Sequence, residues 1–458
     1  MKILEVNTYD AAGGAERVVE QLADEFRARG HDCWRAVGFK RTNARDVYRI
    51  DNDRLNERWR QVWMSRGASL RKLVGRGVGA SRLVPVVEER IAPGFEGIAE
   101  ERGYQPLNFP GTWRLLGLTP EPPDLVHCHN LHGPFLHQGG YFDLRALPWL
   151  SAQVPVVITL HDSWLLTGHC AHSFDCERWR IGCGRCPDLA IYPAVKRDAT
   201  DVNWARKNSI YERAALFVAT PCRWLEERVE RSMLASAVIE SRVIANGIDL
   251  DVFHPQRDDE RHRWGFEASD TILMTISSRF EEERWRDPQM AVDAFSLLRS
   301  RYPDLKLIVV GGAGSEPERD GDILRLPFQR GPSDMARIFR AADLYLHPAR
   351  ADTFPNAVIE ALACGTPVVA PHVGGIPEQI IDVGSRAGRH ATGSLATAAN
   401  AAAMADAVSA VLEDPLLLAA LSENASRDAA ARFDMRRQAD EYLEWFEELV
   451  EVRQAIGS

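Results

Sequence analysis

Two carboxylates, Asp352 and Glu360, stand in a short stretch that also carries a signal for the start of a helix. Pro355 has the fixed φ that suits a first helical turn, so we expect a helix to begin between Phe354 and Asn356. Free backbone N–H groups and the positive end of the helix dipole at such a start attract phosphate. Glu360 shares a face with Asn356 and can accept hydrogen bonds from sugar hydroxyls. The stretch therefore predicts a sugar-nucleotide pocket.

This stretch, followed by Ala-Leu-Ala-Cys-Gly-Thr-Pro-Val-Val and by Gly-Gly-Ile-Pro-Glu at residues 374–378, resembles the retaining glycosyltransferases of family 4. The resemblance implies that Glu360 holds the ribose of a nucleotide sugar and that Asp352 holds hydroxyls of the donor sugar. The family usually has Glu at the first position, and a branch in bacterial polysaccharide biosynthesis is similar to this chain in carrying Asp. Residues between the two acids are expected to bind substrate: Thr353, Phe354, Pro355 and Asn356.

A glycine loop near the start of the chain is a second candidate. Residues 2–7 read as a buried strand, Gly13 and Gly14 follow it, and a helix is expected to run to about Arg29. Glycines let the backbone approach a ligand, and the family resemblance places this turn over the donor diphosphate, facing the acceptor. A plain tight turn is the alternative. The loop lacks a GxGxxG motif, which argues against a dinucleotide-dependent dehydrogenase.

A cluster of histidines follows the apolar residues that begin at Asp124. The sequence DLVHCHNLHG predicts a strand ending in a loop with His127, His129, Asn130 and His132. We favour an active-site lining at the carboxyl edge of the sheet, with Asn130 binding substrate. A metal site is the alternative, for which the local sequence offers no evident carboxylate partner.

His161 follows the next buried strand, expected over residues 154–160. The matching histidine of the family lies by the donor sugar and its transferred centre, so the resemblance makes His161 a catalytic candidate. A hydrogen-bonded structural histidine at a strand end is the alternative.

Arginines supply candidate partners for the donor diphosphate. Arg279 follows the first strand of the second half, where the family keeps an arginine, and Arg284 or Arg286 takes the place of the family's lysine. Arginine can bind phosphate in a bidentate manner. Phe328 falls where the family has its base-binding loop.

Four of the eight cysteines occur within seventeen residues, in a Cys-rich loop expected over residues 168–188. The final Cys-Gly-Arg-Cys is a common half-site for zinc, and tetrahedral zinc can take four thiolates. Such a zinc would have all its positions filled and would be structural. Local disulfides or free thiols are the alternatives. The candidate ligands are Cys170, Cys176, Cys183 and Cys186.

Residues 54–82 form a basic segment with eight Lys or Arg and one acid, and its large apolar residues recur at helical spacing. A helix packed on the core with a solvated charged face is one interpretation. The other is peripheral contact with an anionic membrane surface or a lipid-linked acceptor.

Composition limits the function classes. The chain has 458 residues, 45% of them hydrophobic and 26% charged, which suits two soluble domains. A formal charge of −10 argues against a nucleic-acid-binding role. No apolar run approaches the roughly 18 residues of a membrane span, and the first residues read as a strand rather than a signal peptide, so we expect a cytoplasmic protein, with peripheral contact at the inner face of the membrane as a further hypothesis.

The fold class expected is α/β, because strands and helices alternate in both halves. The resemblance specifies the GT-B fold, with two Rossmann-like, doubly wound domains facing a central cleft and a C-terminal helix crossing back to the N-terminal domain. We expect an acceptor-side domain at 1–255, a nucleotide-sugar-binding domain at 265–435 and the returning helix at 436–458.

The predicted function is that of a retaining glycosyltransferase, of the hexosyltransferase type. It would move a sugar from a nucleotide-diphosphate sugar to a saccharide, lipid-linked or small-molecule hydroxyl acceptor, with no cofactor and no divalent ion required for catalysis. The alternatives are a GT-B sugar-nucleotide epimerase or hydrolase and a non-catalytic nucleotide-sugar-binding subunit.

Overall fold

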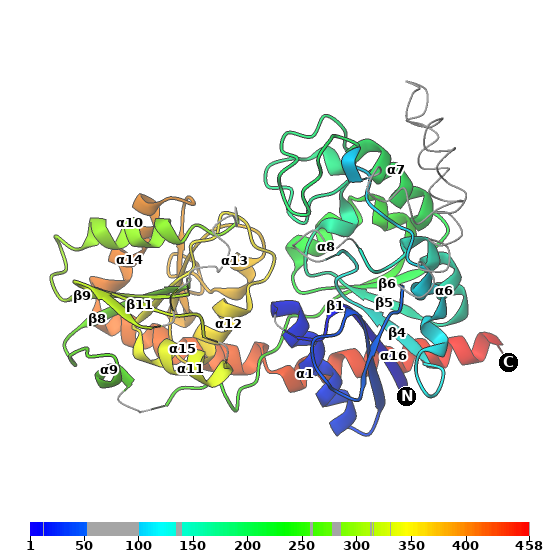
Figure 1. Cartoon of the computed structure of the whole chain (residues 1–458). Helices are drawn as coiled ribbons and strands as arrows, with labels where there is room; N and C mark the ends of the chain where they lie inside the picture. The colour runs from blue at the N-terminus through cyan, green and yellow to red at the C-terminus, as the bar shows by residue number, and fades with distance from the viewer. Residues whose placement is uncertain are drawn as a thin grey trace. The chain divides into compact units, whose positions relative to one another are not determined.

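The computed structural model divides into two compact units (Figure 1). It describes residues 1–11, 13–52, 100–133, 140–256, 260–276, 285–311, 314, 316–329 and 331–457. Unit 1 comprises Met1–Thr220, Leu225–Val243 and Glu441–Ser458, and unit 2 comprises Pro221–Trp224 and Ile244–Asp440. The contacts thus divide the chain near residues 243 and 440.

Unit 1 is built on a parallel sheet, which in the described part of the chain has seven strands in the order β3-β2-β1-β4-β5-β6-β7. The strands Val156–Thr159 and Leu216–Thr220 are nearly continuous apolar runs, as expected where helices cover both faces of a parallel sheet. The strands are β1 (Lys2–Tyr9), β2 (Asp32–Phe39), β3 (Val47–Arg49), β4 (Leu125–Cys128), β5 (Val156–Thr159), β6 (Leu216–Thr220) and β7 (Val238–Val243).

The helix α1 (Gly14–Ala28) packs on β1 and β2 of this sheet through one apolar face. In α1, the buried side chains recur three or four residues apart, from Val18 to Phe26, as in an amphipathic helix. The ring of Phe26 lies against Phe446 of the last helix, with centroids 5.8 Å apart. The helices are α1 (Gly14–Ala28), α6 (Leu147–Gln153), α7 (Thr200–Tyr211), α8 (Arg223–Glu230) and α16 (Met435–Gly457).

Unit 2 contains a second sheet, with the order β10-β11-β9-β8-β12-β13-β14 among the described residues. Only the β10–β11 pair is antiparallel in this set. The strands are β8 (Thr271–Ile276), β9 (Leu305–Val310), β10 (Glu318–Asp320), β11 (Ile323–Leu326), β12 (Leu344–Leu346), β13 (Val368–Pro371) and β14 (Gly393–Ala396).

The core of unit 2 joins this sheet to its helices, with α10 and α14 packed together and buried over β8, β9 and β12 (Figure 1). Proline opens three of the helices, at α10, α11 and α15, where its missing N–H costs no intrahelical bond. The helices are α9 (Glu260–Arg263), α10 (Pro288–Leu298), α11 (Pro332–Ala341), α12 (Asn356–Ala363), α13 (Ile376–Gln379), α14 (Ala401–Leu412) and α15 (Pro415–Arg432).

The two sheets confirm the α/β class with two Rossmann-like units. Residues 441–458, at the end of α16, group with unit 1. None of the helices in the described ranges is long and apolar enough to cross a membrane. The basic segment 54–82 lies outside the described residues.

Candidate active site

The carboxyl ends of three neighbouring strands bring the histidines of unit 1 together. Strand β4 lies between β1 and β5, and Glu5 on β1 pairs in register with His127 on β4. His129 follows β4 directly, and His161 follows β5 after Leu160. Because the strands are parallel, these residues meet at one edge of the sheet, where ligands bind in doubly wound folds.

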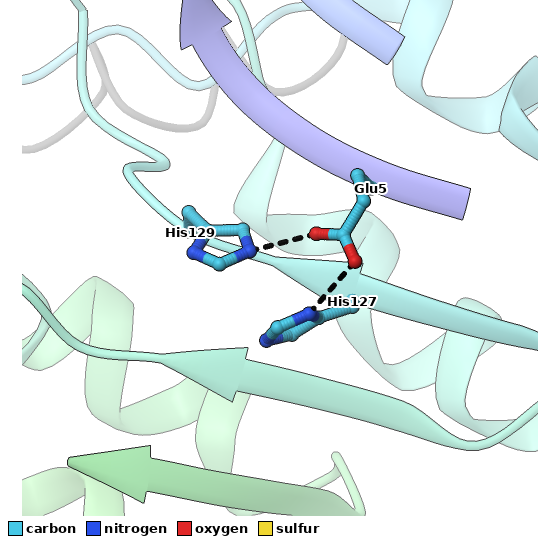
Figure 2. A group of neighbouring side chains, drawn as sticks. All are labelled: Glu5, His127 and His129. Carbon is cyan, nitrogen blue, oxygen red and sulfur yellow. Dashed lines mark hydrogen bonds and ion pairs between the residues drawn. The ribbon is translucent and has the colours of Figure 1, made fainter. Parts of the chain in front are cut away.

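Figure 2 shows that the Glu5 carboxylate lies between two histidines. Its Oε1 is 3.0 Å from Nδ1 of His127, and its Oε2 is 2.7 Å from Nε2 of His129. Nδ1 of His129 is in turn 3.0 Å from Nε2 of His161. Glu5 and His127 are fully buried and His129 is 2% exposed, whereas His161 is partly exposed. We refer to Glu5, His127, His129 and His161 as the Glu5 network.

Burial and neighbouring groups set the protonation of Glu5, His129 and His161 at neutral pH. Burial opposes ionisation of Glu5, but the charge and hydrogen bonds of His127 and His129 outweigh burial and hold the pKa of Glu5 at about 2. Burial lowers the pKa of His129 to about 4 and that of His161 to about 3, and in each case a neighbouring histidine adds to the effect. Glu5 is therefore ionised, and His129 and His161 are neutral.

A second polar pair, His132 and Asp162, lies beside the network. Nε2 of His132 is 2.9 Å from Oδ2 of Asp162, and Oδ1 of Asp162 accepts a 2.7 Å bond from the backbone N–H of Trp164. Against the effect of burial, the pairing raises the pKa of His132 and lowers that of Asp162. The Tyr192 hydroxyl lies 3.0 Å from Nδ1 of His132. The pair thus orients the loop that follows β4.

The glycine loop leads into α1, which begins at Gly14. Gly13 has extended backbone, and a Cβ there would lie 1.9 Å from Oε2 of Glu16, so a side chain would displace that carboxylate. Burial raises the pKa of Glu16. Asn130 uses its backbone carbonyl to accept a 3.1 Å bond from Thr8 Oγ1. Glu16 and the Asn130 carbonyl therefore already have protein neighbours.

In unit 2, Asp352 is partly exposed and lies beside Arg286 and His347. Its Oδ2 lies 3.3 Å from Nη2 of Arg286 and 3.4 Å from Nε2 of His347, both longer than ordinary hydrogen bonds. Tyr345 fixes His347 from behind, with its hydroxyl 2.9 Å from Nδ1. Gly374 has a φ of +56°, and a Cβ there would lie 1.8 Å from the Asp352 carbonyl oxygen. We refer to Asp352, Arg286 and His347 as the Asp352 cluster.

The expected helix start is confirmed, because α12 begins at Asn356 with Pro355 as its N-cap residue. Glu360 lies one turn in and is 6% exposed. Oδ1 of Asn356 accepts a 3.0 Å bond from the side-chain amide of Asn246. The backbone N–H groups of the first turn and the Glu360 carboxylate thus lie at the carboxyl edge of the second sheet.

The other residues predicted to bind substrate differ in their surroundings. Thr353 is 4% exposed, and its carbonyl lies 3.5 Å from Sγ of Cys222. Phe354 is 7% exposed and packs on Phe433, with centroids 6.0 Å apart. Thr353 and Phe354 therefore support the loop from within, whereas Phe328 is 47% exposed.

Of the three candidate phosphate-binding arginines, the structure describes one. Arg286 lies beside Asp352, as given above, and its backbone bridges to Ala349. Arg279 and Arg284 lie outside the described residues.

The Cys-rich loop gathers its cysteines around one cavity, which His169 also lines. Nε2 of His169 is 3.3 Å from Sγ of Cys186, and Nδ1 is 3.1 Å from the carbonyl oxygen of Pro193. The backbone N–H of Gly168 donates to Sγ of Cys183 at 3.3 Å. In the described part of the chain, only Glu5, His127 and His129 have potential metal-ligand atoms that all lie within 4.8 Å of one another. The sulfur atoms of the Cys-rich loop therefore line one cavity but do not all lie within that distance of one another. The cysteines of this cavity are Cys170, Cys176, Cys183 and Cys186.

Sequence reasoning missed three residues of these clusters. Glu5 is a charged residue inside an otherwise apolar strand, and that is the signal that could have found it. His347 follows the apolar strand β12, as His161 follows β5. Tyr192 lies sixty residues from His132 and had no local signal.

Comparison with family models gives two adjoining matches. The model "Glycosyltransferase Family 4" matches residues 12–252, which are 241 of the 458 residues. The model "Glycosyl transferases group 1" matches residues 257–428. The chain therefore belongs to the family 4 glycosyltransferases.

Curated relatives match over part of their length. D-inositol 3-phosphate glycosyltransferase of Mycolicibacterium smegmatis is 29% identical over 329 residues, which cover 67% of each chain. The putative colanic acid biosynthesis glycosyl transferase WcaC of Escherichia coli is 25% identical over 58% of this chain and 64% of its own. The chain thus spans about two thirds of these relatives, and less of several others.

Solved structures with the same fold match almost the whole chain. Sucrose-phosphate synthase from Thermosynechococcus elongatus has a TM-score of 0.60 at 18% identity, covering 98% of this chain and 99% of the other. Anabaena HepE, solved in complex with UDP-glucose, has a TM-score of 0.59 at 19% identity, covering 98% and 100%. At such identities the likeness shows the fold, which is GT-B.

Proposed function

We propose that this glycosyltransferase moves a sugar from a nucleoside diphosphate sugar to a hydroxyl of a saccharide, lipid-linked or small-molecule acceptor, with retention of the anomeric configuration. The observation that carries the proposal is the arrangement at the carboxyl edge of unit 2. There Asp352, the start of α12 and the buried carboxylate of Glu360 follow one another within nine residues. Carboxylates that accept hydrogen bonds from sugar hydroxyls, next to backbone N–H groups that bind phosphate, suit a sugar nucleotide.

Each group of this edge has a proposed role. Glu360 accepts hydrogen bonds from the ribose, and Asp352 accepts them from the transferred sugar. Arg286 and the first-turn N–H groups of α12 stabilise the departing diphosphate. Since Arg286 lies 3.3 Å from Asp352, one cation serves both the acid and a phosphate beside it. These charges supply the leaving-group stabilisation, and we propose that the transfer needs no divalent ion.

The proposed step exchanges one bond for another on the same face of the sugar. The bond between the anomeric carbon and the phosphate oxygen breaks, and the acceptor oxygen bonds to that carbon. The acceptor's proton passes to the departing phosphate oxygen, and a nucleoside diphosphate leaves. His161 would bind the donor sugar near the reacting carbon.

A donor screen by thermal shift tests the binding half of the proposal. Uridine diphosphate sugars come first, because HepE was solved with UDP-glucose. A ligand at 100 times its Kd stabilises the folded state by about 2.7 kcal/mol. We expect the shift to be lost in Glu360→Ala and kept in Glu413→Ala, an exposed acid of unit 2 that pairs with Arg301.

Donor hydrolysis tests the catalytic half. Slow release of nucleoside diphosphate that vanishes in Glu360→Ala and in His161→Ala, and persists with EDTA, would support the transferase. A C2-epimerised product would instead identify a sugar-nucleotide epimerase. Tight donor binding without turnover, over a broad panel of acceptors, would identify a non-catalytic binding subunit.

We also propose a structural zinc in the Cys-rich loop, because its four thiols line one cavity and Gly168 donates a backbone N–H to Sγ of Cys183. His169 is a fifth candidate, since its Nε2 lies 3.3 Å from Sγ of Cys186. Elemental analysis of reduced, chelator-free protein should find about one zinc per chain. The visible spectrum of the Co²⁺-substituted protein distinguishes a site of four thiolates from one of three thiolates and an imidazole. His169→Ala should change this spectrum only if His169 is a ligand, and His172→Ala is the control. Less than about a tenth of an equivalent of metal would rule out the site.

Peripheral membrane contact remains a proposal for the basic segment 54–82 alone. Co-sedimentation with vesicles that contain anionic lipid should exceed that with neutral vesicles and fall with salt. Equal binding to both would contradict it.

A further inference from the structure

We propose that Glu5 and His129 are positioning residues that hold His161 in the tautomer protonated at Nε2, so that His161 presents Nδ1 as a hydrogen-bond acceptor. The proposal concerns the direction of each hydrogen bond in the Glu5 network. The group that donates to Nδ1, a hydroxyl of the donor sugar, is identified from the proposed function, on which this part of the proposal rests.

The direction starts at Glu5, because an ionised carboxylate can only accept hydrogen bonds. Both histidines that contact it must therefore donate. His127 donates through Nδ1 at 3.0 Å, and His129 donates through Nε2 at 2.7 Å (Figure 2).

The next step follows from the single N–H of a neutral imidazole. His129 uses its N–H on Glu5, so its Nδ1 carries a lone pair. The partner of that lone pair is Nε2 of His161, 3.0 Å away, which must then carry the proton. A neutral His161 protonated at Nε2 has its own lone pair at Nδ1.

Neutrality of both rings is supported by their surroundings. His129 is 2% exposed, and burial lowers its pKa to about 4. The pKa of His161 falls to about 3, through burial and the neighbouring His129. At neutral pH neither ring carries the second proton that would let it donate in both directions.

The other branch of the network ends in the same carboxylate. Nε2 of His127 lies 2.7 Å from Oγ1 of Thr159, which lies 2.7 Å from the hydroxyl of Tyr442 on α16. This branch does not reach His161. Tyr442 is therefore a suitable control. It is buried and connects to Glu5 through Thr159 and His127, a route that does not include His161.

The consequence is that Nδ1 of His161 can bind only a group that donates a hydrogen bond. His161 is partly exposed. Among the described side chains, its ring makes a hydrogen bond through Nε2, to His129, and none through Nδ1. A lone pair held there accepts a hydroxyl of the sugar and cannot protonate the leaving group. His161 would thus select and orient the donor sugar and would not act as an acid.

A metal ion among Glu5, His127 and His129 is the competing interpretation, because their ligand atoms all lie within 4.8 Å. Metal on Nε2 of His129 would displace its proton to Nδ1. His129 would then donate to His161, and His161 would be protonated at Nδ1. The two interpretations therefore predict opposite tautomers.

The test is a long-range ¹H–¹⁵N correlation spectrum of the full chain with ¹⁵N-labelled histidine, in which the two ring nitrogens report the tautomer. His161 is assigned by the loss of its signals in His161→Gln. In wild-type protein whose metal content has been measured, we expect the His161 ring to be neutral and protonated at Nε2. A proton at Nδ1 of His161, with or without bound metal, would overturn the proposal.

Two variants of His129 sharpen the test. His129→Phe keeps the ring but removes both nitrogens, so His161 should sample both tautomers, and kcat should fall by up to about 100-fold with a smaller change in KM. In His129→Gln the amide can donate to Glu5 and accept from His161, so the tautomer and most of the activity should return. Tyr442→Phe should leave the His161 signals unchanged. A His129→Phe protein whose His161 stays wholly protonated at Nε2 would also overturn the proposal.

The spectra need no substrate, so they separate this proposal from the proposed function. An inactive protein with the expected tautomer would leave the positioning role intact and refute the transferase. An active transferase with the opposite tautomer would do the reverse.

Discussion

The Glu5 network of unit 1 and the Asp352 cluster of unit 2 each place a carboxylate beside histidine at the carboxyl edge of a Rossmann-like sheet. In the first, the carboxylate is fully buried and both its oxygens take bonds of 2.7 and 3.0 Å. In the second, the carboxylate is partly exposed, and its contacts to Arg286 and His347 are 3.3 and 3.4 Å long. The Glu5 carboxylate is thus shut away from solvent, whereas the Asp352 carboxylate is partly open to it.

The difference shows that a buried acid next to histidines is not by itself a binding group. In our proposals Glu5 acts on a ligand only through His129 and His161, whereas Asp352 binds the donor sugar directly. Removing Glu5 should therefore cost stability first, and changing Asp352 should cost activity first. The predictions below test this division, from the largest expected effect to the smallest.

Glu5→Leu should destabilise unit 1 by about 3–5 kcal/mol, because it leaves the buried N–H groups of two histidines without their acceptor. Asp352→Asn should cost less than about 1 kcal/mol, since its contacts are long and partly solvated. Urea denaturation, followed by hydrogen exchange resolved to each unit, measures both. Equal losses in the two variants would remove the distinction between the clusters.

Gly374→Ala should destabilise unit 2 by about 2–4 kcal/mol and weaken donor binding, since the new Cβ would press on the Asp352 carbonyl. The matched control is Gly321→Ala. Gly321 has nearly the same φ, +57°, with nothing within 4 Å of the new Cβ, so only the cost of a left-handed backbone, about 1–2 kcal/mol, should appear. If both variants bind donor equally well, the position of Asp352 does not depend on Gly374.

Glu360→Gln should weaken donor binding by about 10- to 150-fold, equivalent to the roughly 1.5–3 kcal/mol of a hydrogen bond to a charged group. It should leave the unfolding free energy within about 1 kcal/mol of wild type. Isothermal titration with the donor found by thermal shift checks the first expectation, and urea denaturation checks the second. Unchanged affinity would exclude Glu360 from the ribose site.

Acid should destabilise unit 1 before unit 2. The pKa values of His129 and His161 are lowered in the folded state, so below about pH 6.5 the unfolded chain binds protons that the folded chain does not. Stability should fall by about 1.4 kcal/mol per pH unit for a fully buried histidine, between pH 6.5 and pH 4. The Glu5 carboxylate adds a further loss as pH falls from about 4.5 towards 2. Hydrogen exchange at pH 5 should show this opening in unit 1, and the reverse order would contradict it.

Local patterns were enough to predict the elements of the fold. The strand before His161 and the helix start at Asn356 lie where the apolar runs and Pro355 indicated, because burial on both faces and a fixed φ act over a few residues. The spacing of Asp352 and Glu360 was equally legible, since one loop and one turn of helix separate them. The four cysteines could be grouped for the same reason.

Tertiary structure alone decided what these residues contact. Glu5 and His127 are 122 residues apart, and they meet because β4 lies between β1 and β5 in a particular register. A shift of one residue would turn Glu5 to the other face of the sheet. The sequence by itself determined the family, the two α/β units and the candidate residues. Strand order and register decided that Glu5 is buried between two histidines while Asp352 lies partly exposed beside Arg286 and His347, because hydrogen-bond partners are set by through-space geometry that no local pattern encodes.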